Sequence, residues 1–152
     1  MKRFDQIKIR IMALNDYAKV YSLWLSTPNM GLNNLDDSKE GIEKYLARNP
    51  STCFVAEKDG NIIGVILAGH DGRRGFIHHA AVSSSEQRSG LGSALVNAAL
   101  SALRNEGICK AILVVFKKNE KGNNFWEKTG FTVRDDLVYR DRALVDITRI
   151  DT

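Results

Sequence analysis

The sequence predicts a mixed α/β fold, formed by a single domain that spans residues 1–152. Two observations lead to this prediction. Stretches with alternating or continuous apolar residues, which are typical of strands, are interspersed with stretches whose apolar residues recur at helical spacing. The length suits one domain, and no repeat, linker or low-complexity tract divides the chain. We therefore expect strands and helices that pack around a common core.

The first half of the chain predicts one strand, two helices and a strand hairpin. The expected elements are a strand at 7–12, a helix from Asn15 or Asp16 to Pro28, a second helix from Asp37 through about Asn49, and strands at 52–58 and 61–69. Asp37 followed by Glu40 is typical of a capping box at the start of a helix. Asp59-Gly60, which separates the last two strands, favours a tight turn.

The second half predicts a long helix between two strands, then a short helix and two closing strands. The expected elements are a strand at 76–83, a helix from Leu91 to Gly107, a strand at 110–116, a helix near 121–129, and strands at 131–135 and 137–147. Residues 110–116 form a continuous apolar run, which indicates a central strand covered on both faces. The whole order is β-α-α-β-β-β-α-β-α-β-β, and the two strands around the long helix should be parallel.

The composition and the distribution of charged and apolar residues argue against several classes of protein. The net charge is +4, but the 22 Lys and Arg residues are scattered, whereas nucleic-acid-binding proteins gather them on one face with stacking aromatic residues. The longest apolar run is far shorter than a membrane span, and the first residues do not resemble a secretory signal. Cys53 and Cys109 are expected to be reduced thiols, and no metal-ligand spacing is present. We therefore expect a cytoplasmic protein with no nucleic acid, no membrane and no metal as partners.

The stretch Gln87–Gly92, QRSGLG, lies where a strand gives way to the long helix. A helix N-terminus exposes unpaired N–H groups and a partial positive charge, which together favour a phosphate. Glycine keeps side chains out of the ligand's approach and allows positive φ. On this stretch alone, a helix start that merely tolerates glycine is an equal alternative. Neither the P-loop nor the Rossmann fingerprint fits, because Ser93 follows the second glycine and Leu95 stands where a third glycine belongs.

Two separated motifs are typical of one family. The first is AAVSSSEQRSGLGSALVNAAL, which starts at Ala80, and the second is NEKGNNFWEKTGF, which starts at Asn119. Together with the order of elements, they resemble the GNAT superfamily of acetyl-CoA-dependent N-acetyltransferases, most of all its small bacterial members. The resemblance covers nearly the whole chain. It implies a GNAT-like fold, with a central mixed β-sheet of six to seven strands flanked by about four helices.

The resemblance also implies that acetyl-CoA is the co-substrate. In the family, backbone N–H groups at the start of the long helix hold the coenzyme pyrophosphate. The pantetheine arm pairs with the end of the preceding strand, and the strands on either side of it separate to make room. The cofactor-binding residues that the resemblance implies are Ala80, Val82, Gln87, Arg88, Ser89, Gly90, Leu91, Gly92, Ser93, Asn119, Phe125 and Trp126.

The catalytic residues that are usual in the family are missing from this chain. Trp126 stands where a tyrosine often acts as the general acid, and Val114 stands where some relatives carry a glutamate base. His78 is the best substitute, because an ordinary histidine pKa suits proton transfer at neutral pH. Strict alternation puts His78 on the same face as Val82, and it makes His79 point the other way. The alternatives are that His78 is structural or that a bulge shifts this parity.

We therefore expect an acyltransferase that moves an acetyl group from acetyl-CoA to a primary amine of a small molecule, peptide or protein. The expected mechanism is direct attack in a ternary complex, with His78 as the catalytic residue. Because the usual tyrosine and glutamate are absent, the alternative is a catalytically weak acyl-CoA-binding sensor or regulatory module. A homodimer is a possible assembly.

Overall fold

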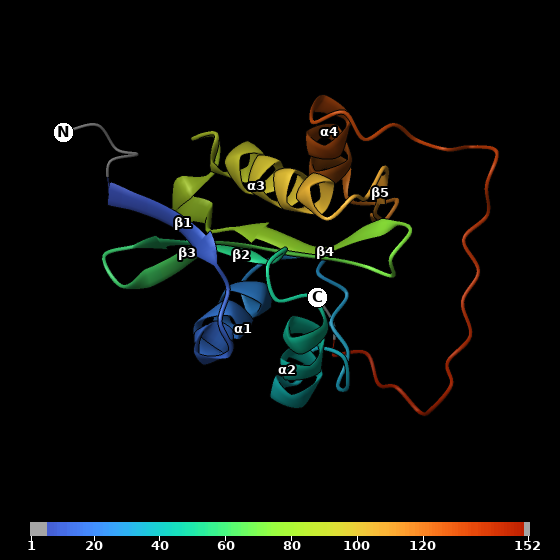
Figure 1. The fold of residues 1–152 in the computed structure, drawn as a ribbon, viewed down its shortest axis with the longest axis horizontal. Helices are drawn as coiled ribbons and strands as arrows, with labels where there is room; N and C mark the ends of the chain where they lie inside the picture. The colour runs from blue at the N-terminus through green and yellow to red at the C-terminus, as the bar shows by residue number, and fades with distance from the viewer. Residues whose placement is uncertain (1–5, 151–152) are drawn as a thin grey trace.

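The computed structural model describes residues 6–150. The strands are β1 (Ile7–Ile11), β2 (Phe54–Lys58), β3 (Asn61–His70), β4 (Gly75–Val82) and β5 (Ala111–Ile112). The helices are α1 (Tyr17–Leu25), α2 (Lys39–Arg48), α3 (Leu91–Asn105) and α4 (Glu120–Lys128), together with the short 3₁₀ helices η2 (Leu14–Asp16) and η3 (Ser84–Glu86). Figure 1 shows the sheet as a middle layer, with α3 and α4 on one face and α1 and α2 on the other.

The strands lie side by side in chain order, β1-β2-β3-β4-β5. The first four are antiparallel neighbours, and β5 runs parallel to β4. The parallel arrangement predicted around the long helix is therefore confirmed. At the turn between β2 and β3, Asp59 (φ +52°) and Gly60 (φ +78°) both adopt left-handed backbone. A two-residue hairpin turn of the predicted kind requires this conformation.

Each face of the sheet has its own buried cluster. The apolar stripe predicted for the long helix is present, and it packs against one face. Its buried members are Leu91, Leu95, Val96, Ala99 and Leu103. Trp24 of α1 and Ile42 of α2 are buried against the opposite face. Helices on both faces hold the central strands in place, so the end of β4 has a fixed position relative to the start of α3.

The second helix begins differently from the predicted capping box. Ser38 is the N-cap residue of α2, and its Oγ accepts a hydrogen bond from the Gly41 N–H at 3.0 Å. Asp37, which was expected to cap, is only 2% exposed. The prediction is wrong because serine and aspartate cap helices about equally well. Only the tertiary structure shows that the carboxylate of Asp37 has another partner.

The sheet has five strands rather than the expected six to seven. β5 is two residues long instead of covering 110–116, and it is not covered on both faces, since Ile112 is 43% exposed. Within the described chain, no strand forms at 131–135 or 137–147. All residues of 132–150 are exposed. Alternating apolar residues form a strand only where a neighbouring strand pairs with them, and this segment stands away from the sheet (Figure 1).

Candidate active site

β4 and β5 are paired at one end and separate at the other. The backbone pairs between them are Gly75 with Ala111 and Phe76 with Ile112. Beyond Phe76, the edge of β4 that faces β5 has no strand partner among residues 6–150. Backbone groups of residues 77–82 on this edge therefore lack a strand partner in the described chain, although Val82 O accepts a hydrogen bond from Gln87 Nε2, and an unpaired strand edge of this kind suits an extended ligand. The separation of strands that the resemblance implies is present.

A loop with left-handed backbone connects β4 to α3. Arg88 has φ +65° and Gly90 has φ +87°. The first helical hydrogen bond runs from the Ala94 N–H to Gly90 O at 3.1 Å, so the N–H groups of residues 91–93 precede the helical ladder. Successive N–H groups that follow a left-handed residue form a concave anion-binding surface, and the helix dipole adds positive potential there. This geometry suits a phosphate group.

Side chains around the loop fix its shape. Ser89 Oγ donates to Glu86 O at 2.5 Å, and Gln87 Nε2 donates to Val82 O at 3.2 Å. Lys121 Nζ, in the first turn of α4, donates to Gln87 Oε1. This contact brings an ammonium group to the loop. Sequence analysis missed Lys121; the only signal available was a lysine in the first turn of the last predicted helix.

Gly92 has a packing role that the sequence does not suggest. A Cβ at this position would lie 3.0 Å from Phe125 Cε1 and 3.8 Å from Val82 Cγ2. The missing side chain therefore makes room for the Phe125 ring of α4. That Gly92 also clears the approach of a phosphate stays a prediction, and its backbone N–H lies at the start of α3.

α4 places two predicted aromatic residues near the end of β4. Phe125 lies against Gly92, as described above, and the Trp126 ring lies 5.0 Å from the Phe125 ring and 5.3 Å from the Phe131 ring. Asn119 is the N-cap of α4, because its Oδ1 accepts a hydrogen bond from the third residue of the helix at 2.9 Å. The side-chain oxygen Oδ1 of Asn119 thus has a structural role at the start of α4.

A β-bulge in β4 puts both histidines on the same face of the sheet. The register against β3 shifts after His78, so that His79 and Ala80 together oppose one residue of β3. His79 has φ +35°, a conformation that residues other than glycine rarely adopt. Val82 packs against the cluster on the α3 face, whereas His78 contacts Tyr45 of α2 on the other face. The prediction that His78 shares a face with Val82 and that His79 points away is therefore wrong.

His79 lies within hydrogen-bonding distance of the buried carboxylate of Asp37. Its Nε2 lies 2.7 Å from Asp37 Oδ1, and the exposed fractions of the two side chains are 15% and 3%. The other carboxylate oxygen accepts a hydrogen bond from the Asn33 N–H at 2.8 Å. Trp24 Nε1 donates to His79 O at 3.2 Å and fixes the strained backbone. Because Nε2 faces Asp37, Nδ1 is the ring nitrogen that this carboxylate does not engage.

His78 has a different environment. Its ring stacks on Phe76 with 4.4 Å between centroids, and the Tyr45 ring meets it edge-on at 5.7 Å. Desolvation by these neighbours, together with the nearby His79, lowers the pKa of His78 to about 4. His78 is therefore neutral at neutral pH, and it holds a proton only weakly. A weak base of this kind is less suited to accept a proton from an amine.

Protonation of His78 should make the protein less stable in mild acid. The pKa of His78 is about 4 in the folded chain and near 6.5 in an unfolded one, so stability is lost as the pH falls through this window. Because His78 is a solvent-exposed residue, solvent screening limits the expected loss to about 1 kcal/mol between pH 7.5 and 5. Urea denaturation of the wild type and of His78→Gln should show a smaller loss in the variant. Equal losses in both would contradict the prediction.

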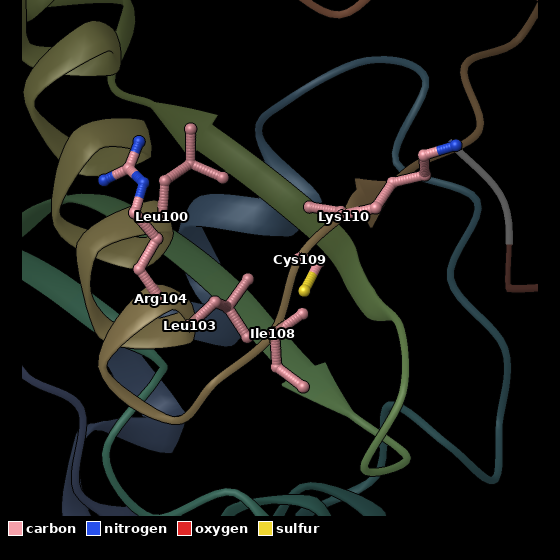
Figure 2. Close-up of a pocket in the computed structure, with 7 residues that line it drawn as sticks. Leu100, Leu103, Arg104, Ile108, Cys109 and Lys110 are labelled. Atoms are coloured by element: carbon pink, nitrogen blue, oxygen red, sulfur yellow. The ribbon is translucent and has the colours of Figure 1, made fainter.

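A separate hollow of about 140 Å³ lies at the other end of α3, between this helix and β5 (Figure 2). Its lining residues are Leu100, Leu103, Arg104, Ile108, Cys109, Lys110 and Ala111. α3 has 15 residues, so the two ends are about 20 Å apart at 1.5 Å per residue. This hollow is therefore not part of the anion-binding loop.

Residues 6–150 contain neither a cluster of metal-binding side chains nor a membrane-spanning helix. In this range, no group of three or more His, Cys, Asp or Glu side chains is placed to hold a metal ion. The helices of the same range are all too short or too polar to cross a membrane.

Comparisons with known proteins agree with the geometry. The profile of the acetyltransferase (GNAT) family matches residues 17–131. An acetyltransferase of Yersinia pestis (strain Pestoides F) is 28% identical over 140 residues, which cover 92% of this chain and 98% of that protein. Ard1 from Thermoplasma volcanium has a similar structure, with a TM-score of 0.75 at 24% identity over 85% of this chain and 84% of that one. The PaiA N-acetyltransferase from Thermoplasma acidophilum, solved in complex with coenzyme A, gives a TM-score of 0.73 at 20% identity over 85% and 91%.

Proposed function

Because the chain belongs to the acetyltransferase (GNAT) family, and is therefore an enzyme that transfers an acyl group from acetyl-CoA, we propose that it acetylates a primary amine. In this proposal the amine attacks the thioester directly in a ternary complex. The observation that carries it is the anion-binding loop at the start of α3 beside the point where β4 separates from β5. The loop suits the pyrophosphate, and the separation suits the extended pantetheine arm.

We assign the pyrophosphate to the loop and to the first turn of α3. The N–H groups of residues 90–93 are the donors. The side chains of Arg88 and Lys121 are the cationic partners, since hydrogen bonds between charged groups are about twice as strong as neutral ones. Gln87 and Ser89 act indirectly, because their hydrogen bonds hold the loop against β4 and η3.

We place the pantetheine arm along the free edge of β4. Ala80 and Val82 are its proposed backbone partners, because they lie beyond the last residue of β4 that pairs with β5. Phe125 and Trp126 of α4 flank it from the other side, near Gly92. Asn119 holds the start of α4 and so positions both aromatic rings. The thioester then lies near the bulge in β4.

We assign the general base to His79, with Asp37 as the residue that positions it. An alkyl ammonium has a pKa near 10, so it must lose a proton before its nitrogen can attack. A buried carboxylate at 2.7 Å stabilises the imidazolium that forms when His79 takes a proton. His78, the residue favoured by the sequence, is the second candidate, because it lies on the same face with its ring centroid 6.2 Å from that of His79.

The protons balance without the tyrosine that Trp126 replaces. The acceptor arrives as an ammonium and gives one proton to His79, which passes it to solvent. The second proton leaves the nitrogen as the C–N bond forms and the C–S bond breaks, and it ends on the thiol of CoA. An indole N–H does not ionise usefully, so Trp126 contributes packing against Phe131 rather than acid catalysis.

Release of the CoA thiol tests the proposal. The purified protein is mixed with acetyl-CoA and a panel of polyamines, aminoglycosides, amino acids and peptides with free N-termini. At least one class should release thiol well above the rate of hydrolysis without an acceptor. Calorimetry tests the coenzyme half separately. Saturable acetyl-CoA binding without transfer to any amine would support the sensor module instead, and no binding at all would reject both functions.

A further inference from the structure

Helix α1 donates hydrogen bonds to both members of the contact between Asp37 and His79. The Tyr17 hydroxyl donates to the backbone oxygen of Asp37 at 2.6 Å. Trp24 Nε1 donates to the backbone oxygen of His79 at 3.2 Å. Asp37 immediately precedes the N-cap of α2, whereas His79 lies in β4. One helix is therefore bonded to the two separate segments whose side chains approach to 2.7 Å.

The spacing of Tyr17 and Trp24 suits this double contact. They are the first and the eighth residues of α1. A separation of seven residues is about two helical turns, so the two side chains lie on the same face and about 10 Å apart along the axis. We call Tyr17 and Trp24 the α1 donors. Because the helix keeps their separation constant, the α1 donors hold the two backbone oxygens at a fixed distance from each other.

Buried side chains hold α1 itself against the sheet. Val20 and Trp24 are 0% exposed and Leu23 is 8% exposed. All three belong to the core cluster on this face, together with Leu67 of β3. A close-packed interior leaves a helix little freedom to shift. The α1 donors are therefore fixed relative to the sheet that carries His79 (Figure 1).

The backbone of His79 needs a partner outside the sheet. His79 belongs to the bulge of β4 and has φ +35°. A residue other than glycine keeps such a conformation only where its surroundings hold it there, and a bulge leaves one residue out of the pairing between strands. Trp24 supplies a hydrogen bond to this backbone, and its ring meets the His79 ring edge-on at 5.2 Å between centroids. Trp24 therefore stabilises the conformation in which His79 faces the layer of α1 and α2.

Asp37 is held at its backbone and at its side chain. Its Oδ2 accepts a hydrogen bond from the Asn33 N–H at 2.8 Å, which leaves Oδ1 directed at His79. Burial is the main cause that raises the pKa of Tyr17 above its usual value, so the Tyr17 hydroxyl keeps its proton at neutral pH and remains a donor. Together these bonds fix the direction of the carboxylate.

We propose that the α1 donors are positioning residues for acetyl transfer, which hold the backbones of Asp37 and His79 so that the imidazole stays against the carboxylate. The inference rests on the proposed function, in which His79 takes a proton from the acceptor amine. The α1 donors act through Asp37 and His79 and need not touch the acceptor. A misplacement of about 1 Å at a reacting group can lower the rate about 100-fold, so the loss of one such bond should be visible in turnover.

Tyr17→Phe tests the bond to Asp37, because it removes the hydroxyl and keeps the ring. Its turnover number should fall about tenfold, and its KM for acetyl-CoA should not change. Tyr21→Phe is the matched control. Tyr21 stacks on Tyr17 with 5.5 Å between ring centroids, and within residues 6–150 its hydroxyl does not bond to Asp37. Tyr21→Phe should therefore keep wild-type turnover.

Trp24→Phe tests the bond to His79, since phenylalanine retains a ring and lacks the N–H. It should also lower the turnover number about tenfold. Val20→Ala removes buried volume from the same helix and leaves both hydrogen bonds in place, so it controls for lost packing and should keep wild-type turnover. If Trp24→Phe does not fold, Tyr17→Phe decides the question, because it removes a single oxygen atom. Wild-type turnover in either folded donor variant would overturn the proposal.

Double variants distinguish positioning from a general structural role. In the His79→Gln protein, Trp24→Phe should cause no further loss of turnover, because the base that Trp24 positions is already absent. Tyr17→Phe should likewise cause no further loss in the Asp37→Asn protein. Losses as large as those in the wild-type background would show that the α1 donors support the fold alone, and they would also overturn the proposal.

Nitrogen NMR of the imidazoles tests the positioning without an acceptor. At about pH 9, well above the ordinary histidine pKa near 6.5, His79 of the wild type should be a single tautomer with its proton on Nε2, the atom that faces Asp37. Tyr17→Phe and Trp24→Phe should give a mixture of tautomers, and Tyr21→Phe should not. An unchanged single tautomer in both donor variants would overturn the proposal. If His79→Gln keeps its turnover while the donor variants give mixed tautomers, the assignment of the base is wrong and the positioning of the imidazole stands.

Discussion

Replacement of His79 by glutamine should lower the turnover number about 100-fold or more, the usual effect of removing a general base, and leave acetyl-CoA affinity unchanged. Glutamine retains an N–H donor for Asp37 Oδ1, which lies 2.7 Å from His79 Nε2, but it cannot accept a proton from the amine. The loss should therefore appear in the chemical step and not in coenzyme binding. Steady-state kinetics with the best acceptor of the panel measures the first quantity, and calorimetry measures the second.

Two control variants distinguish the catalytic roles of His78 and His79. His78→Gln should have a small effect on turnover, because the low pKa of His78 makes it a poor base at neutral pH. Asp37→Asn should reduce turnover less than His79→Gln, since it removes the positioning carboxylate and keeps the imidazole. A larger loss in His78→Gln than in His79→Gln would assign the base to His78. If the turnover of His79→Gln stays within about twofold of wild type, His79 is not the general base.

Replacement of Gly90 by alanine should weaken acetyl-CoA binding by about tenfold. Gly90 has φ +87° immediately before α3, and an L-residue pays about 1–2 kcal/mol in this conformation. The loop of the variant should relax to a different shape when no ligand is bound. Binding must then restore the strained shape, and about 1.4 kcal/mol corresponds to a tenfold change in affinity. Calorimetric titration with acetyl-CoA measures the effect.

Gly107→Ala is the matched control for backbone strain. Gly107 has φ +82° just beyond the other end of α3, and a Cβ there would meet nothing within 4 Å. Gly107→Ala should therefore lose about 1–2 kcal/mol of unfolding free energy, and Gly90→Ala should lose less when no ligand is bound, because its loop relaxes. Only Gly90→Ala should lose coenzyme affinity. Equal affinity in the two variants would show that the loop does not hold the pyrophosphate.

The local elements of the fold could be predicted from the sequence, because their signals are local. The Asp59-Gly60 turn and the apolar stripe of α3 depend on residues close together in the chain. The closing strands at 131–135 and 137–147 could not be predicted correctly. Their alternation shows that they suit a sheet, but whether they pair with one depends on contacts that the chain pattern does not contain.

The candidate site could be predicted in part. A loop with left-handed backbone before a helix follows from QRSGLG and its position, and its binding of a phosphate stays a prediction. The orientation of His78 and His79 could not be predicted, because a bulge adds one residue to β4 and reverses the parity of the strand. The contact between His79 and Asp37 could not be predicted either. Asp37 is 42 positions away in the chain, and its spacing to Glu40 favours a helix cap instead.

The early divergence of β4 from β5 has a consequence for the lifetime of the enzyme as well as for catalysis. In the described chain, only two residue pairs join these strands, so the coenzyme proposed to bind between them would add contacts that the sheet itself does not make there. A ligand at 100 times its dissociation constant adds about 2.7 kcal/mol to the stability of the protein that binds it. Cells rich in acetyl-CoA would thus shield the enzyme from proteolysis, and starved cells would remove it sooner.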